Sequence, residues 1–292
     1  MNSAEIKTIL DRLYESRSQS HLSNDPLSFC HRYEDPLDRE VVAVLASAFA
    51  YGAVAIILRT LEAILAELGP HPRTFIEKLD PQQGLHAFRG FKHRFNDGRD
   101  LVALLWAIRL IIEKAGSING FFLTGHDPQA QDISGSLNSY SANVLALDYQ
   151  PVFGCTSPPK GSYFSFLFPA PASGSACKRL CMFLRWVVRP SDGIDLGIWH
   201  GIPPVQLVIP VDTHIQRISG YLGFTNRKQA DWRMACEITT ALRRLDPLDP
   251  VKYDFSLAHL GISEGCDGID PVKCLSCPIA GICRQTTIPK KS

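Results

Sequence analysis

Helix-period spacing of apolar residues runs through most of this chain and constrains its fold more than any other feature. The longest such pattern extends from Leu37 to Leu68 and stops at Gly69, before Pro70. Its uncharged part, Val41 to Leu58, is borderline in length for a membrane span and is interrupted near Gly52. We therefore expect two buried core helices that meet near Gly52, rather than a helix in a bilayer.

Start and stop signals mark further helices. An Asp followed by Pro is typical of a helix start, and Asp25, Asp35 and Asp249 each precede a proline. No stretch of any length alternates with the period of two that strands require, so the predicted fold class is all-α. The other expected helices begin at Ser3 and cover residues 100–116, 141–147, 174–189, 213–222 and 227–245.

The composition of the chain changes between residues 126 and 175, where Pro, Gly and Ser are frequent and the helical periodicity of apolar residues is weak. A long loop inside a compact domain is usually functional or disordered, and the aromatic run 163–168 argues against disorder. We therefore divide the chain into an N-terminal helical part (1–125), a long loop region (126–175), a second helical lobe (176–261) and a cysteine-rich loop with a tail (262–292).

Composition sets limits on partners and location. The 292 residues are 45% hydrophobic and 20% charged, with a net charge of +1, so any nucleic-acid binding must come from a local patch. Nine cysteines, four of them clustered, and an N-terminus without an apolar run favour a reducing compartment and a metal site over disulfides. We expect a cytoplasmic monomer that does not associate with membranes.

The stretch from Pro210 to Ile218 places Asp212 at the expected start of a helix that stops at Gly223. A carboxylate held at a helix N-terminus by a rigid, proline-led entry is fixed in position and can act on a bound substrate. The simpler interpretation is that Asp212 only caps the helix, which is a common role for this residue type.

Four cysteines near the C-terminus follow the pattern C-x7-C-x2-C-x5-C: Cys266, Cys274, Cys277 and Cys283. Four thiolates in one loop can hold a zinc ion or an iron–sulfur cluster. Zinc ribbons usually contain two C-x2-C pairs, whereas this loop has one pair with unequal outer gaps, which favours iron–sulfur with zinc as the alternative. We expect the other cysteines to be small core residues: Cys30, Cys155, Cys177, Cys181 and Cys236.

The sequence Val-Asp-Thr-His-x2-Arg around Asp212, followed by four cysteines, resembles the helix-hairpin-helix DNA glycosylase superfamily. Its endonuclease III branch holds a 4Fe-4S cluster in a C-x6-C-x2-C-x5-C loop, one residue shorter in the first gap. That branch carries its lysine nucleophile in a Leu-Pro-Gly-Val-Gly hairpin about eighteen residues before the aspartate. Here the corresponding position is Ile194 and no such hairpin is present, so the chain departs from that branch.

The archaeal 8-oxoguanine glycosylase branch is more similar, because its lysine opens a helix some thirty residues before an Ile-Pro-Val-Asp element. Lys178 stands 34 residues before Asp212, which lies in Ile-Pro-Val-Asp. The resemblance implies that Lys178 is the Schiff-base lysine and Asp212 the catalytic carboxylate. The alternative for Lys178 is a solvated lysine in the first turn of an amphipathic helix.

The resemblance implies a base-excision repair glycosylase with AP-lyase activity, acting on double-stranded DNA that contains a damaged base. The archaeal branch suggests an oxidised guanine. It also implies a two-lobed helix-hairpin-helix fold and a structural 4Fe-4S cluster held by the four clustered cysteines. Two alternatives stay open: a non-catalytic iron–sulfur protein that binds nucleic acid, and a zinc-stabilised helical scaffold for protein partners.

Several further segments are weaker candidates for DNA contacts. Ser47 and Tyr51 correspond to positions that border the base pocket in the glycosylases, although core packing explains them as well. Residues 88–95 mix aromatic and basic side chains, which can stack on bases and contact phosphates or can form an ordinary solvated loop. The glycine-rich bridge 190–204 offers backbone amides to a phosphate. An aromatic wedge would come from Trp199 or from residues 163–168.

Overall fold

A computed structural model describes residues 2–285, of which most are helical: 59% of the chain is helix and 2% is strand. The mainly helical class is therefore confirmed. The α-helices are α1 (Ser3–Glu15), α2 (Pro36–Ala48), α3 (Val54–Leu68), α4 (Pro72–Glu77), α5 (Pro81–Ala87), α6 (Gly98–Ala115), α7 (Ile118–Leu123), α8 (Ser134–Leu145), α9 (Gln150–Phe153), α10 (Lys178–Val188), α11 (Thr213–Leu222), α12 (Trp232–Arg243), α13 (Asp254–Ile262) and α14 (Pro271–Leu275).

One short hairpin was not expected from the sequence. Strands β1 (Lys92–His93) and β2 (Asn96–Asp97) pair antiparallel, with Lys92 opposite Asp97 and His93 opposite Asn96. Two residues per strand are too few to give an alternating pattern, so periodicity could not reveal them. Short 3-10 helices complete the described elements: Gln19–Asn24, Pro26–Arg32, Phe164–Leu167, Pro171–Ser173, Pro204–Gln206 and Ala280–Ile282.

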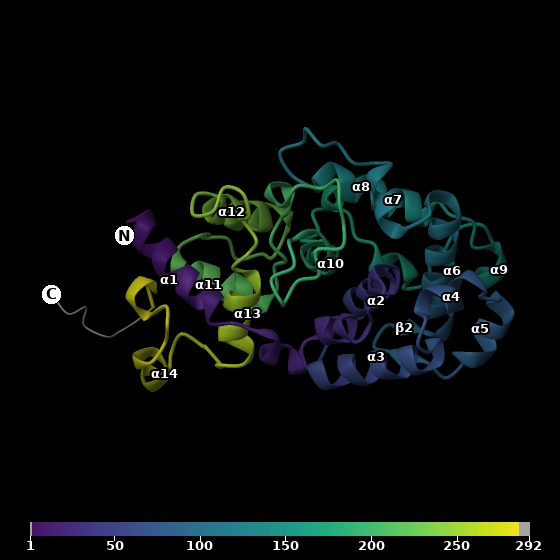
Figure 1. Ribbon diagram of the computed structural model, residues 1–292, viewed down its shortest axis with the longest axis horizontal. Coiled ribbons are helices and arrows are strands. Elements are labelled where there is room, and N and C mark those ends of the chain that lie inside the picture. The colour runs from purple at the N-terminus through teal and green to yellow at the C-terminus, as the bar shows by residue number, and fades with distance from the viewer. Residues whose placement is uncertain (1, 286–292) are drawn as a thin grey trace.

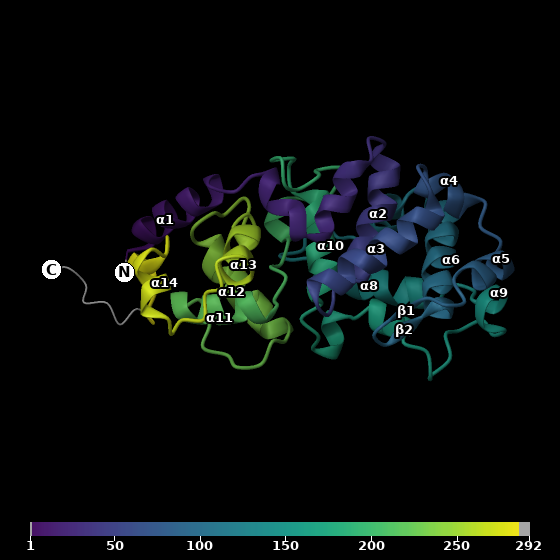
Figure 2. The ribbon, with the colours of Figure 1, turned by 90° about the horizontal axis from the view of Figure 1, so that it is seen from below.

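The helices spread along one long axis (Figure 1). Helices α3 to α6 and α9 lie toward one end, α1 and α11 to α14 lie at the other, and α10 lies between them, as the view from below confirms (Figure 2). Helix α1 therefore packs with the C-terminal helices although it comes first in the chain. The Tyr253 hydroxyl donates to Asp11 over 2.7 Å, and Arg17 forms an ion pair with Glu264.

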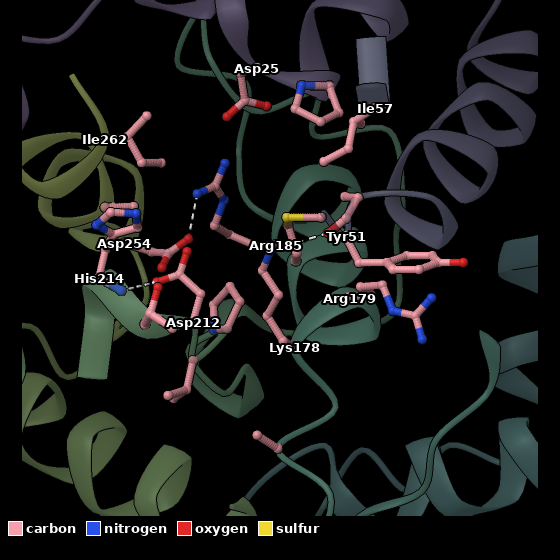
Figure 3. Close-up of a pocket in the computed structure, with 18 of the residues that line it drawn as sticks. Asp25, Tyr51, Ile57, Lys178, Arg179, Arg185, Asp212, His214, Asp254 and Ile262 are labelled. Atoms are coloured by element: carbon pink, nitrogen blue, oxygen red, sulfur yellow. Dashed lines mark hydrogen bonds and ion pairs between the residues drawn. The ribbon is translucent and has the colours of Figure 1, made fainter. Parts of the chain in front are cut away.

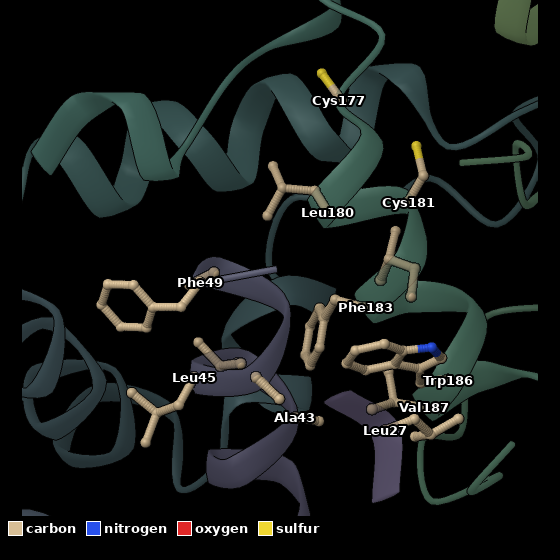
Figure 4. Packing of buried hydrophobic residues seen from close by; sticks show 14 of the residues in the cluster. Leu27, Ala43, Leu45, Phe49, Cys177, Leu180, Cys181, Phe183, Trp186 and Val187 are labelled. Carbon is tan, nitrogen blue, oxygen red and sulfur yellow. The ribbon is translucent and has the colours of Figure 1, made fainter. Parts of the chain in front are cut away.

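The main core lies where α2 packs against α10. Leu45 of α2 and Phe49 just after it lie on one side, and Phe183 and Trp186 of α10 lie on the other (Figure 4). From Val41 onward α2 is buried throughout, which explains the uncharged run that begins there. Helices α2 and α3 are separated at Gly52, whose φ of +105° suits glycine, as predicted. No helix in the described part of the chain has the length and hydropathy needed to span a bilayer.

Several predicted helix starts are confirmed by their caps. The carboxylates of Asp25, Asp35 and Asp212 each accept backbone N–H bonds at the N-terminus of the helix that follows. The start predicted at Asp100 is three residues late, because Asp97 caps α6 and Asp100 completes the capping box.

Four other helix starts were wrong. Helix α10 begins at Lys178 rather than at residue 174, and α12 begins at Trp232 rather than at residue 227. The helix expected from Asp249 begins at Asp254, because the Asp249 carboxylate bonds the guanidinium of Arg189 at 2.9 Å instead of capping. The short helix expected at 141–147 is longer and begins at Ser134. Its first turn is rich in Ser and Gly, which hid its helical character in the sequence.

Candidate active site

A cavity of about 810 Å³ opens between α10, α11 and α13, and both Lys178 and Asp212 line it. Figure 3 shows the two side chains projecting into the same space from separate helices. The cavity falls within the roughly 300–1,000 Å³ of typical small-molecule sites. The two residues singled out from their spacing in the sequence therefore share one pocket.

Lys178 is the first residue of α10 and is half-buried. Cys177 before it adopts the left-handed region with φ +47°, a conformation that non-glycine residues rarely take. This turn directs the lysine toward the segment after α2, where Nζ lies 3.4 Å from the carbonyl oxygen of Ala50. The amine is thus held at the cavity wall by a single long contact and has room to move into the cavity.

Asp212 caps α11 through one carboxylate oxygen. Oδ1 accepts the backbone N–H groups of His214 at 2.9 Å and Ile215 at 2.8 Å. Within residues 2–285 no hydrogen bond to Oδ2 is found. Capping and a chemical role are therefore compatible, because one oxygen fixes the side chain while the other stays available to a ligand.

A second carboxylate, Asp254, lies beside Asp212 on the cavity wall (Figure 3). Its Oδ2 accepts a hydrogen bond from Arg185 at 2.5 Å. Burial raises the pKa of the Asp254 carboxyl to about 6; the charge of Arg185 opposes this rise and the negative charge of Asp212 adds to it. Sequence reasoning missed this residue. The available signal was a single Asp at the start of an otherwise apolar helical run.

Asp25 completes the acidic side of the cavity. It caps the 3-10 helix Pro26–Arg32 through the N–H of Leu27 and lies 3.8 Å from Nε2 of His259. Burial raises its pKa, but the hydrogen bonds from His259 and Leu27 and the charges of Arg185 and His259 together outweigh burial, so the net shift of the pKa is downward. Asp25 was predicted only as a helix cap, and that role is confirmed.

A buried ionic network lies behind the cavity and fixes the bridge between α10 and α11. Arg185 bonds Asp195 at 3.1 Å as well as Asp254, and Arg189 pairs with Asp192 at 3.0 Å and with Asp195. Each carboxylate of this network faces at least one guanidinium, so the buried charges are compensated. The network joins the helix that carries Lys178 to the helix that carries Asp254.

Several amides of the bridge 190–204 bond acceptors within the protein. The N–H groups of Ile194 and Asp195 bond the Asp192 carboxylate, and those of Leu196 and Trp199 bond carbonyl oxygens of α10. These four amides are therefore occupied within the protein. The glycines serve the path of the chain instead: a Cβ on Gly197 would stand 2.6 Å from the backbone nitrogen of Ser191.

Trp199 is not available as a wedge. It is 4% exposed and packs between Phe122 and Phe183, with ring centroids 5.5 and 5.0 Å away. Among residues 163–168 the aromatic side chains divide: Phe164 and Phe168 are buried, whereas Tyr163 and Phe166 are exposed. Only the second pair is accessible to a ligand.

Tyr51 and Phe166 form one rim of the cavity, whereas Ser47 lies in the core and does not line it. Arg179 is held between them: its guanidinium lies 5.0 Å from the Tyr51 ring and 4.2 Å from the Phe166 ring. Its Nη1 donates to the carbonyl oxygen of Ala48 at 2.6 Å. Burial lowers the pKa of this guanidinium to about 10.

Three of the clustered cysteines line a second, smaller cavity of about 170 Å³ next to α14: Cys266, Cys274 and Cys277. Cys283 is buried close by. Burial raises the pKa of the Cys266 thiol, and the nearby thiols of Cys283 and Cys274 raise it further. Among residues 2–285 no three His, Cys, Asp or Glu side chains are arranged to bind one metal ion.

The remaining cysteines are mostly core residues, as predicted. Cys30, Cys177 and Cys181 are buried and Cys236 is partly buried. Cys155 is the exception, because it follows the turn at Gly154 and is exposed.

Helix α11 connects the large cavity to the cysteine loop. Arg217, one turn after His214, donates to the carbonyl oxygen of Cys266 and lies 3.3 Å from Nδ1 of His214. The Tyr221 hydroxyl donates to the carbonyl oxygen of Asp267 at 2.9 Å. The helix that is capped by Asp212 is therefore fixed at its far side by the loop.

Fold and site together define a mainly helical protein with a lysine and an aspartate at two helix starts on one cavity and a cysteine-rich C-terminal loop. Residues 25–263 match the family described as protein of unknown function (DUF2400), and the chain belongs to this family. Lys178 and Asp212 fall inside the matched segment, and the four clustered cysteines follow it. No curated protein and no solved structure matches the chain.

Proposed function

We propose that this protein is a DNA N-glycosylase with AP-lyase activity and that the 810 Å³ cavity receives a damaged base turned out of the duplex. The observation that carries the proposal is the meeting of Lys178 and Asp212 in that cavity from helix starts 34 residues apart.

The proposed reaction starts with attack by the neutral Nζ of Lys178 on C1′ of the damaged nucleotide. The C1′–Nζ bond forms as the glycosidic bond breaks, and the base leaves with a proton. The lone pair of Nζ then forms the C=N bond of the Schiff base as the C1′–O4′ bond breaks, and O4′ takes up a proton. The Schiff base loses a proton from C2′, and the electron pair expels the 3′ phosphate. Both steps need groups that accept and return protons close to the sugar.

Asp212 is the group placed for this role. Its capped carboxylate has a fixed orientation, and its negative charge stabilises the positive charge that develops on the sugar. Asp254 lies next to Asp212, and the ion pair with Arg185 fixes the position of the Asp254 carboxylate. Turning a base out of a duplex costs a few kcal/mol, roughly, and less at a damaged pair.

The cysteine loop supplies a donor set that fits an iron–sulfur cluster. In a 4Fe-4S cluster each iron takes one thiolate, so the four sulfurs surround a space instead of converging on a single ion. Three cysteines around a 170 Å³ cavity with a fourth nearby are compatible with this arrangement. The cluster would be held by Cys266, Cys274, Cys277 and Cys283. It would stabilise the conformation of the loop that contacts α11.

Borohydride trapping tests the proposal. The protein is incubated with labelled duplexes that contain 8-oxoguanine, uracil, an oxidised pyrimidine or an abasic site, and the Schiff base is reduced to a stable adduct. We expect a covalent band on at least one duplex, lost in Lys178→Ala and retained in Lys78→Ala, an exposed lysine outside the cavity. DNA binding without a band on any duplex would contradict the lyase and leave a non-catalytic binding protein.

A further inference from the structure

Three exposed aromatic side chains gather at the edge of the large cavity, on two segments far apart in the sequence. Phe95 is 46% exposed, Tyr163 is 50% exposed and Phe166 is 43% exposed. The Phe95 and Tyr163 rings stack with centroids 5.2 Å apart and an interplanar angle of 22°, and Phe166 meets Phe95 edge-on at 6.2 Å. A soluble protein seldom exposes several large rings together unless the patch binds something.

This aromatic platform (Phe95, Tyr163 and Phe166) continues directly into the cavity. Phe166 lines the cavity and contacts Tyr51, which lines it too, with ring centroids 5.3 Å apart. Arg94 at the hairpin tip reaches the same rim, since a Cβ on the cavity residue Gly52 would stand 3.0 Å from its Cδ. A molecule that enters the cavity at this side must pass over the platform.

A buried polar network holds the platform in place. His93 bonds Thr60 at 2.8 Å, and Asn96 donates to the carbonyl oxygen of Tyr163 at 3.1 Å. Asp100 accepts from Asn96 at 3.0 Å and from Ser162 at 2.6 Å. The hairpin and the 162–166 segment are thus joined beneath the exposed rings, so little conformational entropy is lost when a ligand binds them.

The charge around the platform is positive. Arg89, Lys92, Arg94 and Arg99 are exposed on or next to the hairpin, and Lys160 is exposed on the opposite segment. Asp97 lies among them, but its carboxylate caps α6. Since the chain as a whole carries a net charge of only +1, this is a local concentration of basic side chains.

We propose that the aromatic platform stacks on an unpaired base of the DNA strand whose damaged nucleotide occupies the cavity, while Arg94 and its basic neighbours contact the flanking phosphates. This proposal rests on the proposed function, and it identifies the platform as the surface that binds the DNA strand next to the damaged nucleotide. Aromatic faces accept any base by stacking, and the cations meet the backbone, so the platform contributes affinity without sequence preference.

Fluorescence anisotropy tests the platform. The ligand is a labelled duplex with a tetrahydrofuran residue as abasic-site analogue and 2-aminopurine beside it. We expect Phe95→Ala and Tyr163→Ala to weaken binding at least about fivefold each, and Phe95→Trp to bind nearly as the wild type. The wild type should also quench 2-aminopurine fluorescence more than the alanine variants do, because a stacked base is quenched.

The control is Leu248→Ala, which removes a side chain that is 79% exposed and lies outside the cavity. The platform residues are exposed, so these variants should keep the wild-type unfolding temperature. One outcome separates the two proposals: the wild type binds DNA and forms the covalent adduct, but a Phe95→Ala/Tyr163→Ala double variant binds with unchanged affinity. The DNA-binding role of the platform is then wrong, and the proposed function stands. If the wild type neither binds DNA nor traps an adduct, both are wrong.

Discussion

Gly261 of α13 lies directly against the imidazole of His214 on α11, and a Cβ at that position would stand 2.2 Å from Nδ1. These two helices carry two of the three cavity carboxylates, since Asp212 caps α11 and Asp254 begins α13. The absence of a side chain at Gly261 therefore sets how closely Asp212 and Asp254 approach.

Replacing Gly261 with Ala should separate the two helices. We expect Gly261→Ala to lower the free energy of unfolding by roughly 1–3 kcal/mol, which is typical of overpacking, and to reduce adduct formation. Denaturant unfolding monitored by circular dichroism measures the first effect. Gly220→Ala is the matched control, because Gly220 lies within α11 with nothing within 4 Å of an added Cβ.

Ala at Gly220 should stabilise the helix by up to about 1 kcal/mol. A Gly261→Ala protein as stable as the wild type would contradict the close packing of α11 on α13.

Asp212 has a structural and a proposed chemical role that two substitutions can separate. Asn caps helices about as well as Asp, so Asp212→Asn should leave stability within roughly 0.5 kcal/mol while lowering the rate of adduct formation by about 10²–10⁴. Asp212→Ala should lose that rate and also about 1 kcal/mol of stability. Single-turnover trapping and denaturant unfolding measure the two quantities. If Asp212→Asn forms the adduct at the wild-type rate, Asp212 has no chemical role and only caps the helix.

The sequence predicted the parts of this site that depend on local signals. The caps at Asp25 and Asp212 follow from residue type, and a helix within 174–189 follows from apolar spacing, although α10 begins four residues later than predicted, at Lys178. The mainly helical fold class was also predictable, because apolar spacing and capping residues are local signals. These predictions needed no knowledge of which helices meet.

Contacts between distant segments could not be predicted in this way. Asp249 has the sequence of a helix cap, but Arg189 from another element takes its carboxylate and the helix starts later. Asp254 and Phe166 join the site only because α13 and the 163–168 segment pack beside α10. Tertiary partners decided these outcomes, and a single sequence contains no direct record of them.

The raised pKa of Asp254 makes a prediction about stability. Its pKa rises from 3.8 to about 6 on folding, mainly through burial. The native state therefore holds this proton more tightly than the unfolded state, so the contribution to stability is full below pH 3.8 and is lost as the pH rises to about 6.

Relative to Asp254→Asn, the wild-type free energy of unfolding should fall by up to roughly 1.4 kcal/mol per pH unit in this interval. Asp246 provides a control of opposite sign. Burial raises its pKa, but the hydrogen bond and charge of Lys252 and the backbone hydrogen bonds from Asp249 and Leu248 together outweigh burial. The net shift of the pKa is therefore downward, and Asp246 stabilises the fold as the pH rises. Urea unfolding at a series of pH values distinguishes the two slopes, and parallel curves for wild type and Asp254→Asn would contradict the assignment.

The cysteine loop provides the last prediction, which concerns the metal. If the loop holds a 4Fe-4S cluster, the protein purified without oxygen should contain about four iron and four sulfide per chain, and Cys274→Ser should lose most of both. Cys155→Ser is the matched control, since Cys155 is exposed and lies outside the loop. Because Arg217 of α11 bonds the carbonyl oxygen of Cys266, loss of the cluster should also weaken the packing of α11 and lower the unfolding temperature. One zinc per chain, with neither iron nor sulfide, would contradict the cluster and support a single-ion site at the same cysteines.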